Sequence, residues 1–171
     1  MSVCSIVSTE YHNLNLSGKE KNKDVIAFKE RLAKVLWGLF RDGTDEFYVN
    51  LEVGVPFWVA EFVCGLKKTN DVYLNIVVPY EEQALKLDKN EGLRNKYYKY
   101  HGEAEQVIFA SKRYSDDCYE IADEIMVDES DKIVIIGDES EDFYIARYAK
   151  ENNVDVEYIG VDSLLGLTVS G

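Results

Sequence analysis

The chain has 171 residues, and a hydrophobic content of 46% is enough to build the packed core of one domain without disulfides. Nineteen basic and 32 acidic residues give a net charge of −13, which disfavours a nucleic-acid partner because its phosphate backbone is also anionic. No apolar run reaches the ~20 residues of a membrane span, and the start of the chain lacks a basic segment followed by an apolar stretch. We therefore expect one soluble, cytoplasmic domain over residues 1–171. It is expected to bind neither nucleic acid nor membranes.

Short apolar runs alternate with segments of helical periodicity along the whole chain. Strands are predicted at residues 3–7, 47–50, 72–78, 105–110, 132–136 and 154–159. Helices are predicted at residues 24–41, 54–66, 91–100, 115–127 and 140–152. Trp37 and Trp58 fall on apolar helix faces and are expected in the core. Regular alternation of strand and helix predicts a three-layer α/β fold with a mostly parallel sheet of about six strands.

Cysteine and histidine residues show no pattern of metal ligands. Cys4, Cys64 and Cys118 contain no CxxC pair, and neither His12 nor His101 has the spacing of a zinc ligand. Cys64 and Cys118 lie on apolar helix faces, where a thiol is expected to be buried and inert. We therefore expect reduced core thiols, no metal and no cofactor.

Three segments carry a resemblance to a known family. FYVNLEVGVPFWVAE spans residues 47–61, VVPYEEQ spans residues 77–83, and residues 113–136 contain MVDESD. In order and spacing they resemble the YpsA-like branch of the SLOG superfamily, whose members are Rossmann-like domains associated with nucleotides or nucleotide-derived ligands. The matching residues are Gly54, Trp58, Ala60, Glu61, Pro79, Tyr80, Gln83, Cys118, Tyr119, Met126, Val127, Asp128, Ser130 and Asp131. The resemblance implies a Rossmann-like (SLOG) fold and a small nucleotide-related ligand.

Two turns depart from the family pattern where a phosphate would be held. Asn50–Leu51 replaces Ser-Gly after the second strand, and an acidic run at 137–142 replaces a Gly-Gly-Thr turn. Glycine lets backbone amides approach an anion, whereas Leu51 adds bulk and four carboxylates within residues 138–142 add like charge. Ala122–Asp123 also replaces an Arg-Asn pair. We therefore expect these turns not to hold an ordinary mononucleotide.

Ligands of parallel sheets bind beyond the carboxyl ends of the strands, and the candidate residues come from those turns. The predicted ligand-binding residues are Ser8, Thr9, Asn50, Glu52, Gly54, Val55, Tyr80, Gln83, Gly137 and Asp138. Ser8 and Thr9 offer hydroxyls, and Glu10 completes their turn. Tyr80 offers a ring for stacking and Gln83 an amide that can read a base. Turn bonding and loop packing remain the alternatives.

Gly54 and Val55 offer backbone amides at a helix start, although a tight turn before Pro56 explains them equally well. Glu52 could hydrogen-bond a ribose or an amine, or act as an acid/base group, or be a solvated loop acid. Asp138 is the second candidate for acid/base chemistry.

For the acidic run, the favoured interpretation is a helix start rather than a cation site. Ser140 is then the N-cap, and Glu141 and Asp142 lie in the first turn.

The leading hypothesis is binding or sensing of a small nucleotide-derived ligand, because the chain lacks a convincing catalytic set. An enzyme that hydrolyses an N-glycosidic bond through Glu52 or Asp138 is the main alternative. A degenerate member that serves as a protein-interaction scaffold is the third. A homodimer is the default expectation for its assembly.

Overall fold

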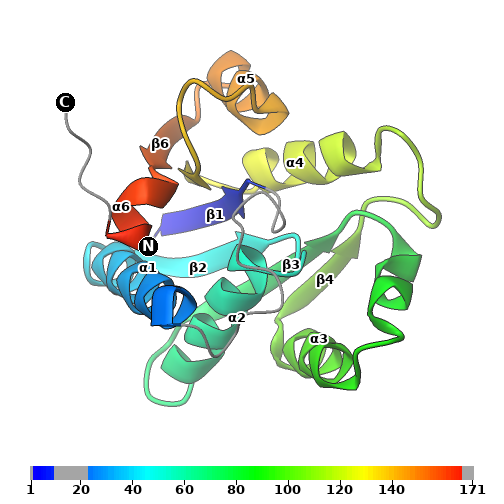
Figure 1. Ribbon diagram of the computed structural model, residues 1–171. Helices are drawn as coiled ribbons and strands as arrows, with labels where there is room; N and C mark the ends of the chain where they lie inside the picture. The colour runs from blue at the N-terminus through cyan, green and yellow to red at the C-terminus, as the bar shows by residue number, and fades with distance from the viewer. Residues whose placement is uncertain (1, 10–22, 167–171) are drawn as a thin grey trace.

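One sheet of six parallel strands runs through the computed structural model, which describes residues 2–9 and 23–166. The strands are β1 (Ser2–Ser8), β2 (Thr44–Val49), β3 (Tyr73–Val78), β4 (Gln106–Phe109), β5 (Lys132–Ile136) and β6 (Asp155–Ile159). Their order across the sheet is β4-β3-β2-β1-β5-β6 (Figure 1). The chain therefore moves outward from β1 to β4, then returns to the other side of β1 for β5. This reversal beside β1 is where ligands bind in open α/β sheets.

Helices cover both faces of the sheet. They are α1 (Lys23–Arg41), α2 (Val55–Leu66), the short 3₁₀ helix η2 (Glu81–Leu87), α3 (Glu91–Glu103), α4 (Cys118–Asp128), α5 (Tyr144–Glu151) and α6 (Val161–Leu165). Helices α1, α2, α3 and α6 pack on one face, and α4 and α5 pack on the other (Figure 1). The predicted three-layer Rossmann-like fold is confirmed. Within residues 2–9 and 23–166, no helix is long and apolar enough to cross a membrane.

Alternation along the central strands builds two separate apolar cores. Ile6 and Val134 face α1 and α2, whereas their neighbours Val7 and Ile135 face α4 and α5. Successive side chains of a strand point to opposite faces, so a strand covered on both sides must be apolar throughout. This requirement explains the continuous apolar runs in the sequence.

Trp37 differs from its predicted position, because 47% of its surface is exposed. The buried stripe of α1 consists of Val25, Phe28, Leu32 and Leu36. Trp37 follows Leu36 and is therefore rotated by about 100° around the helix, out of that stripe. Trp58 is buried as expected, and its ring meets Phe28 edge-to-face at 5.5 Å between centroids.

The last long helix begins later than predicted, at Tyr144, with Phe143 as its N-cap. Ser140 is therefore not the N-cap. The carboxylate of Asp138 accepts a hydrogen bond from the Ser140 amide at 2.8 Å, and the Glu141 amide donates to the Asp138 carbonyl at 2.9 Å. Aspartate commonly holds such turns because its side chain competes with helical hydrogen bonding. The acidic run therefore forms a turn rather than a first helical turn.

Candidate functional site

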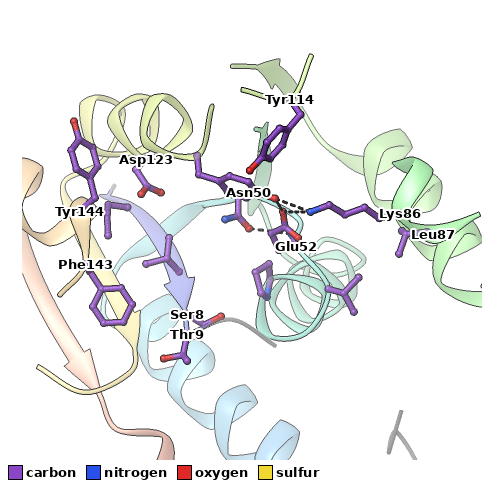
Figure 2. A pocket seen from close by; sticks show the side chains of 15 residues that line it. Ser8, Thr9, Asn50, Glu52, Lys86, Leu87, Tyr114, Asp123, Phe143 and Tyr144 are labelled. Atoms are coloured by element: carbon purple, nitrogen blue, oxygen red, sulfur yellow. Dashed lines mark hydrogen bonds and ion pairs between the residues drawn. The ribbon is translucent and has the colours of Figure 1, made fainter. Parts of the chain in front are cut away.

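A pocket of about 590 Å³ opens at the carboxyl ends of β1 and β2 and beside the starts of α4 and α5 (Figure 2). Its lining residues come from five segments that are distant in the sequence. They are Val7, Ser8, Thr9, Asn50, Glu52, Val53, Pro56, Lys86, Leu87, Tyr114, Tyr119, Asp123, Phe143, Tyr144 and Ile145. The volume lies within the range of about 300–1,000 Å³ that is typical of small-molecule sites.

The turn after β2 keeps a glycine-like backbone even though it carries leucine. Leu51 has a φ of 57°, in the left-handed region that glycine adopts without penalty. Its side chain is 1% exposed and packs in the core, so the expected bulk does not enter the pocket. The Asn50 side-chain oxygen accepts the Glu52 amide at 3.1 Å and braces the turn. A left-handed leucine costs about 1–2 kcal/mol, which burial of its side chain offsets.

Glu52 is held in the pocket by groups from two other segments. Its Oε1 accepts hydrogen bonds from the Tyr119 hydroxyl at 2.5 Å and from the Gln83 amide at 3.2 Å. The Lys86 ammonium forms an ion pair with the same oxygen at 3.7 Å. Among the residues that the structure describes, none contacts Oε2 with a hydrogen bond or ion pair. A fixed carboxylate with one available oxygen is a suitable group for a ligand hydroxyl or amine.

Lys86 and Tyr119 form the polar wall beside Glu52. The Lys86 ammonium donates to the Tyr119 hydroxyl at 2.9 Å and lies 5.3 Å from the Tyr80 ring centroid. Burial alone would lower the pKa of Lys86, but the bond to Tyr119 and the charge of Glu52 outweigh it and raise the pKa above its ordinary value. Burial and the bond to Glu52 also raise the pKa of Tyr119. At neutral pH Lys86 is therefore a cation and Tyr119 a neutral hydrogen-bond donor.

Asp123 lines the pocket one helical turn after Tyr119 on α4 and is partly buried. Figure 2 shows its side chain between those of Tyr144 and Asn50. Burial raises the pKa of Asp123 to about 7, and the charges of Glu120 and Glu124 add to the shift. No hydrogen bond or ion pair joins its carboxyl to any residue within 2–9 and 23–166. Asp123 therefore has a raised pKa and no hydrogen-bonding or ion-pair partner among the described residues.

Four of the predicted ligand-binding residues, Ser8, Thr9, Asn50 and Glu52, line the pocket. Gly54 and Val55 are buried beside it at the start of α2, where Gly54 has a φ of 110° and Pro56 occupies the first turn. The predicted residue Glu10 lies outside the described residues.

Tyr80 and Gln83 are not among the residues that line the pocket, but both contact residues that do. Gln83 is 3% exposed, and its amide nitrogen donates to the Asn50 carbonyl as well as to Glu52. Its amide oxygen accepts from the Tyr97 hydroxyl at 3.0 Å. Tyr80 is 6% exposed and meets the Tyr114 ring edge-to-face at 5.4 Å. In this arrangement the two residues orient the groups that face the pocket.

In the turn after β5, a carboxylate of the chain itself accepts hydrogen bonds from nearby amide and hydroxyl groups. Glu141 accepts from the Thr9 hydroxyl at 3.2 and 3.3 Å and from the Asp138 amide at 3.1 Å. Gly137 is required here, because a Cβ atom would lie 2.9 Å from the Phe143 ring. Asp138 lies outside the pocket, and its hydrogen bond with the Ser140 amide holds its pKa below the ordinary value. The Thr9 hydroxyl and the amides of Asp138 and Ser140 are therefore already bound by carboxylates of the chain itself.

The sequence reasoning assigned no ligand role to Lys86, Tyr114, Tyr119, Asp123, Phe143 or Tyr144, all of which line the pocket. Asp123 did carry a signal, since Ala122–Asp123 replaces an Arg-Asn pair of the resembled family. Exchange of a pair that contains one base for a pair that contains one acid makes this segment more negative.

A parallel six-stranded sheet with helices on both faces and a pocket at its reversal point defines a Rossmann-like α/β domain. A model of the YspA SLOG family matches residues 6–164, and the chain belongs to this family. The predicted family resemblance is confirmed.

Relatives with the name UPF0398 protein occur in several bacteria. The Listeria innocua protein is 27% identical over 137 residues, which cover 78% of this chain and 75% of the relative. The Halalkalibacterium halodurans protein is 25% identical over 142 residues, covering 81% and 74% of the two chains. A Listeria monocytogenes protein is 30% identical over 81 residues, covering 47% and 45%.

Proposed function

We propose that the protein binds a small nucleoside-derived ligand in the pocket and acts as a binding or sensing module. The observation that carries this proposal is the combination of aromatic side chains with a fixed carboxylate. Tyr114, Tyr119, Phe143 and Tyr144 offer rings for a base, and Glu52 offers an oxygen for the ribose hydroxyls. The SLOG resemblance supports a nucleotide-related ligand.

A terminal phosphate has no evident place in this proposal. Glu141 already occupies the Thr9 hydroxyl and the Asp138 amide, and Lys86 is engaged by Glu52 and Tyr119. A phosphate would meet carboxylates where a phosphate site usually has free amides and unpaired cations. We therefore expect the nucleoside part of a ligand to provide most of its affinity.

A thermal-shift and calorimetry series tests the proposal with nucleosides and their 5′-phosphates. A ligand at about 100 times its Kd stabilises the folded state by about 2.7 kcal/mol, which raises the Tm of a chain of this size by about 5–10 °C. Glu52→Gln should reduce this shift, because an amide NH₂ now occupies one of the two oxygen positions. The control Glu61→Gln removes a carboxylate that pairs with Lys29 at 3.1 Å, away from the pocket, and should leave the shift unchanged. Absence of any shift with every nucleoside would refute the proposal.

A second candidate function is hydrolysis of an N-glycosidic bond. It is favoured by one observation: two carboxyl groups in different environments, Glu52 and Asp123, line the same pocket. Protonated Asp123 would give its proton to the leaving base as the C1′–N bond breaks, and water would add to C1′ and return a proton to Asp123. Chromatography of a nucleoside incubated with the protein tests this function. Release of free base that both Asp123→Asn and Glu52→Gln abolish supports it, whereas no release across a nucleoside panel removes it.

We also propose a reducing compartment such as the cytoplasm as its location. Cys4, Cys64 and Cys118 are free and buried, which is the usual state of cysteines in such a compartment. Fractionation of cells that produce the native protein tests this location.

A further inference from the structure

We propose that the pocket selects a ligand whose ring system carries a positive charge, with Asp123 as its counter-ion. This inference rests on the proposed function and deepens it by naming the charge class of the ligand. The ligand class is a nucleoside with a cationic heterocycle, as opposed to a nucleoside with a neutral base or a phosphorylated form.

The charges around the pocket support a cation. Two acids, Glu52 and Asp123, and one base, Lys86, occur among the described residues that line it. Lys86 is already paired with Glu52, at 3.7 Å, so Asp123 remains as the charge without a partner. Glu120 and Glu124 add negative charge close to Asp123, as their influence on its pKa shows. A cationic ligand would neutralise this excess, and an anionic ligand would increase it.

The aromatic side chains support the same charge class. Aromatic faces attract cations, and a flat cationic ring adds stacking to this attraction. The pocket already shows the interaction twice: the Lys86 ammonium lies 5.6 Å from the centroid of the Tyr119 ring, and the Arg147 guanidinium lies 5.7 Å from that of the Tyr144 ring. Tyr114 also lines the site and lies outside both pairs. A ligand cation between these rings and Asp123 would combine stacking with an ion pair.

Asp123 gives the proposal a measurable pH dependence. The carboxylate form is needed for the ion pair, and burial together with Glu120 and Glu124 raises the pKa of Asp123 to about 7. The other titratable side chains that line the pocket are Glu52, Lys86, Tyr114, Tyr119 and Tyr144. The raised pKa of Asp123 lies between pH 6 and 8, whereas the pKa values of Lys86, Tyr119 and Tyr144 are raised further above that range.

The test uses two probes of similar size that differ in charge. Nicotinamide riboside has a permanently cationic pyridinium ring, and its reduced dihydro form is neutral. Calorimetry at pH 8 should show that the cationic form binds at least about tenfold more tightly, the value of one ion pair of about 1.4 kcal/mol. The carboxylate fraction of a group with a pKa of about 7 falls from about 0.9 at pH 8 to about 0.1 at pH 6. Because the protonated form still binds the cation about tenfold more weakly, the affinity should fall about fivefold.

Variants of the same chemistry complete the test. Asp123→Asn should remove both the preference for the cation and its pH dependence. Asp71→Asn, which neutralises an exposed carboxylate before β3 and outside the pocket, should change neither. Equal or tighter binding of the neutral probe would overturn this inference and leave the proposed function standing. If neither probe nor any neutral nucleoside binds, both proposals are overturned.

Discussion

Replacement of Asp123 by asparagine should stabilise the fold, and the gain should increase with pH. In the folded protein, burial and the charges of Glu120 and Glu124 raise the pKa of this carboxyl from 3.8 to about 7. Between pH 3.8 and about pH 7, the Asp123 carboxyl is therefore protonated in the folded protein and ionised in the unfolded chain. Because unfolding releases this proton, the contribution of Asp123 to stability falls as pH rises, and the loss is complete above pH 7.

The size of the effect follows from the pKa values. Each unit of pKa difference corresponds to about 1.4 kcal/mol, so ionisation of Asp123 costs the folded state about 4 kcal/mol at pH 8. At pH 5 the carboxyl of the folded protein keeps its proton while that of the unfolded chain is ionised, and the cost to the folded state is about 2 kcal/mol. The advantage of Asp123→Asn over the natural chain should therefore grow by about 2–3 kcal/mol between pH 5 and pH 8.

Urea denaturation at the two pH values measures this difference. Comparison of the same two proteins at both pH values cancels any pH-independent effect of the asparagine itself. Asp71→Asn serves as the control, because its exposed carboxylate should change stability by less than about 0.5 kcal/mol at either pH. An advantage of Asp123→Asn that is equal at pH 5 and pH 8 would show that the carboxyl does not titrate near neutral pH.

Three further perturbations have defined outcomes. Leu51→Gly should be more stable than Leu51→Ala by about 1 kcal/mol, because glycine adopts the left-handed backbone without strain. At Leu36 within α1, which serves as the control, the alanine variant should instead be more stable than the glycine variant by about 1 kcal/mol. Chemical denaturation measures both differences, and the same order at both sites would contradict the strain argument. Glu120→Gln should lower the pKa of the neighbouring pocket aspartate, which an NMR titration of its carboxyl carbon detects as a midpoint at lower pH; an unmoved midpoint would exclude this charge as a cause. Tyr119→Phe should lower the free energy of unfolding by about 1–3 kcal/mol, since the Glu52 carboxylate and the Lys86 ammonium each lose one hydrogen bond. Tyr98→Phe, on an exposed ring, should lower it by less than about 0.5 kcal/mol. Equal losses in urea denaturation would mean that the pocket network adds no stability.

Periodicity in the sequence was sufficient to predict every strand of the sheet to within a few residues. The central strands are covered on both faces, so their composition is dominated by apolar residues and is easily recognised. The start of α5 was predicted wrongly, because Ser140 before two acids is typical of a helix start. The side chain of Asp138 takes the Ser140 amide instead, and this competition leaves no trace in the apolar pattern.

The site was predictable only where it depends on the ends of strands. Ser8 ends β1 and Glu52 lies three residues after the end of β2, so their place at the pocket follows from the parallel sheet. Tyr119 reaches Glu52 across 67 positions of sequence, and Lys86 reaches Tyr119 across 33. Such pairs depend on the order of strands and on helix orientation, neither of which a single sequence contains. The pKa of Asp123 depends on the same packing.

The hydrogen bonds that Glu141 accepts from Thr9 and Asp138 have a consequence for specificity. The carboxylate is attached to the same short loop as one of its donors, the Asp138 amide, and its other donor is Thr9 at the end of β1, so it competes with any dissolved anion at an effective concentration on the order of millimolar or higher. A free phosphate compound at lower concentration would lose this competition even if its own charge were well matched. Loss of the Glu141 carboxylate by substitution would return the Thr9 hydroxyl and the Asp138 amide to solvent.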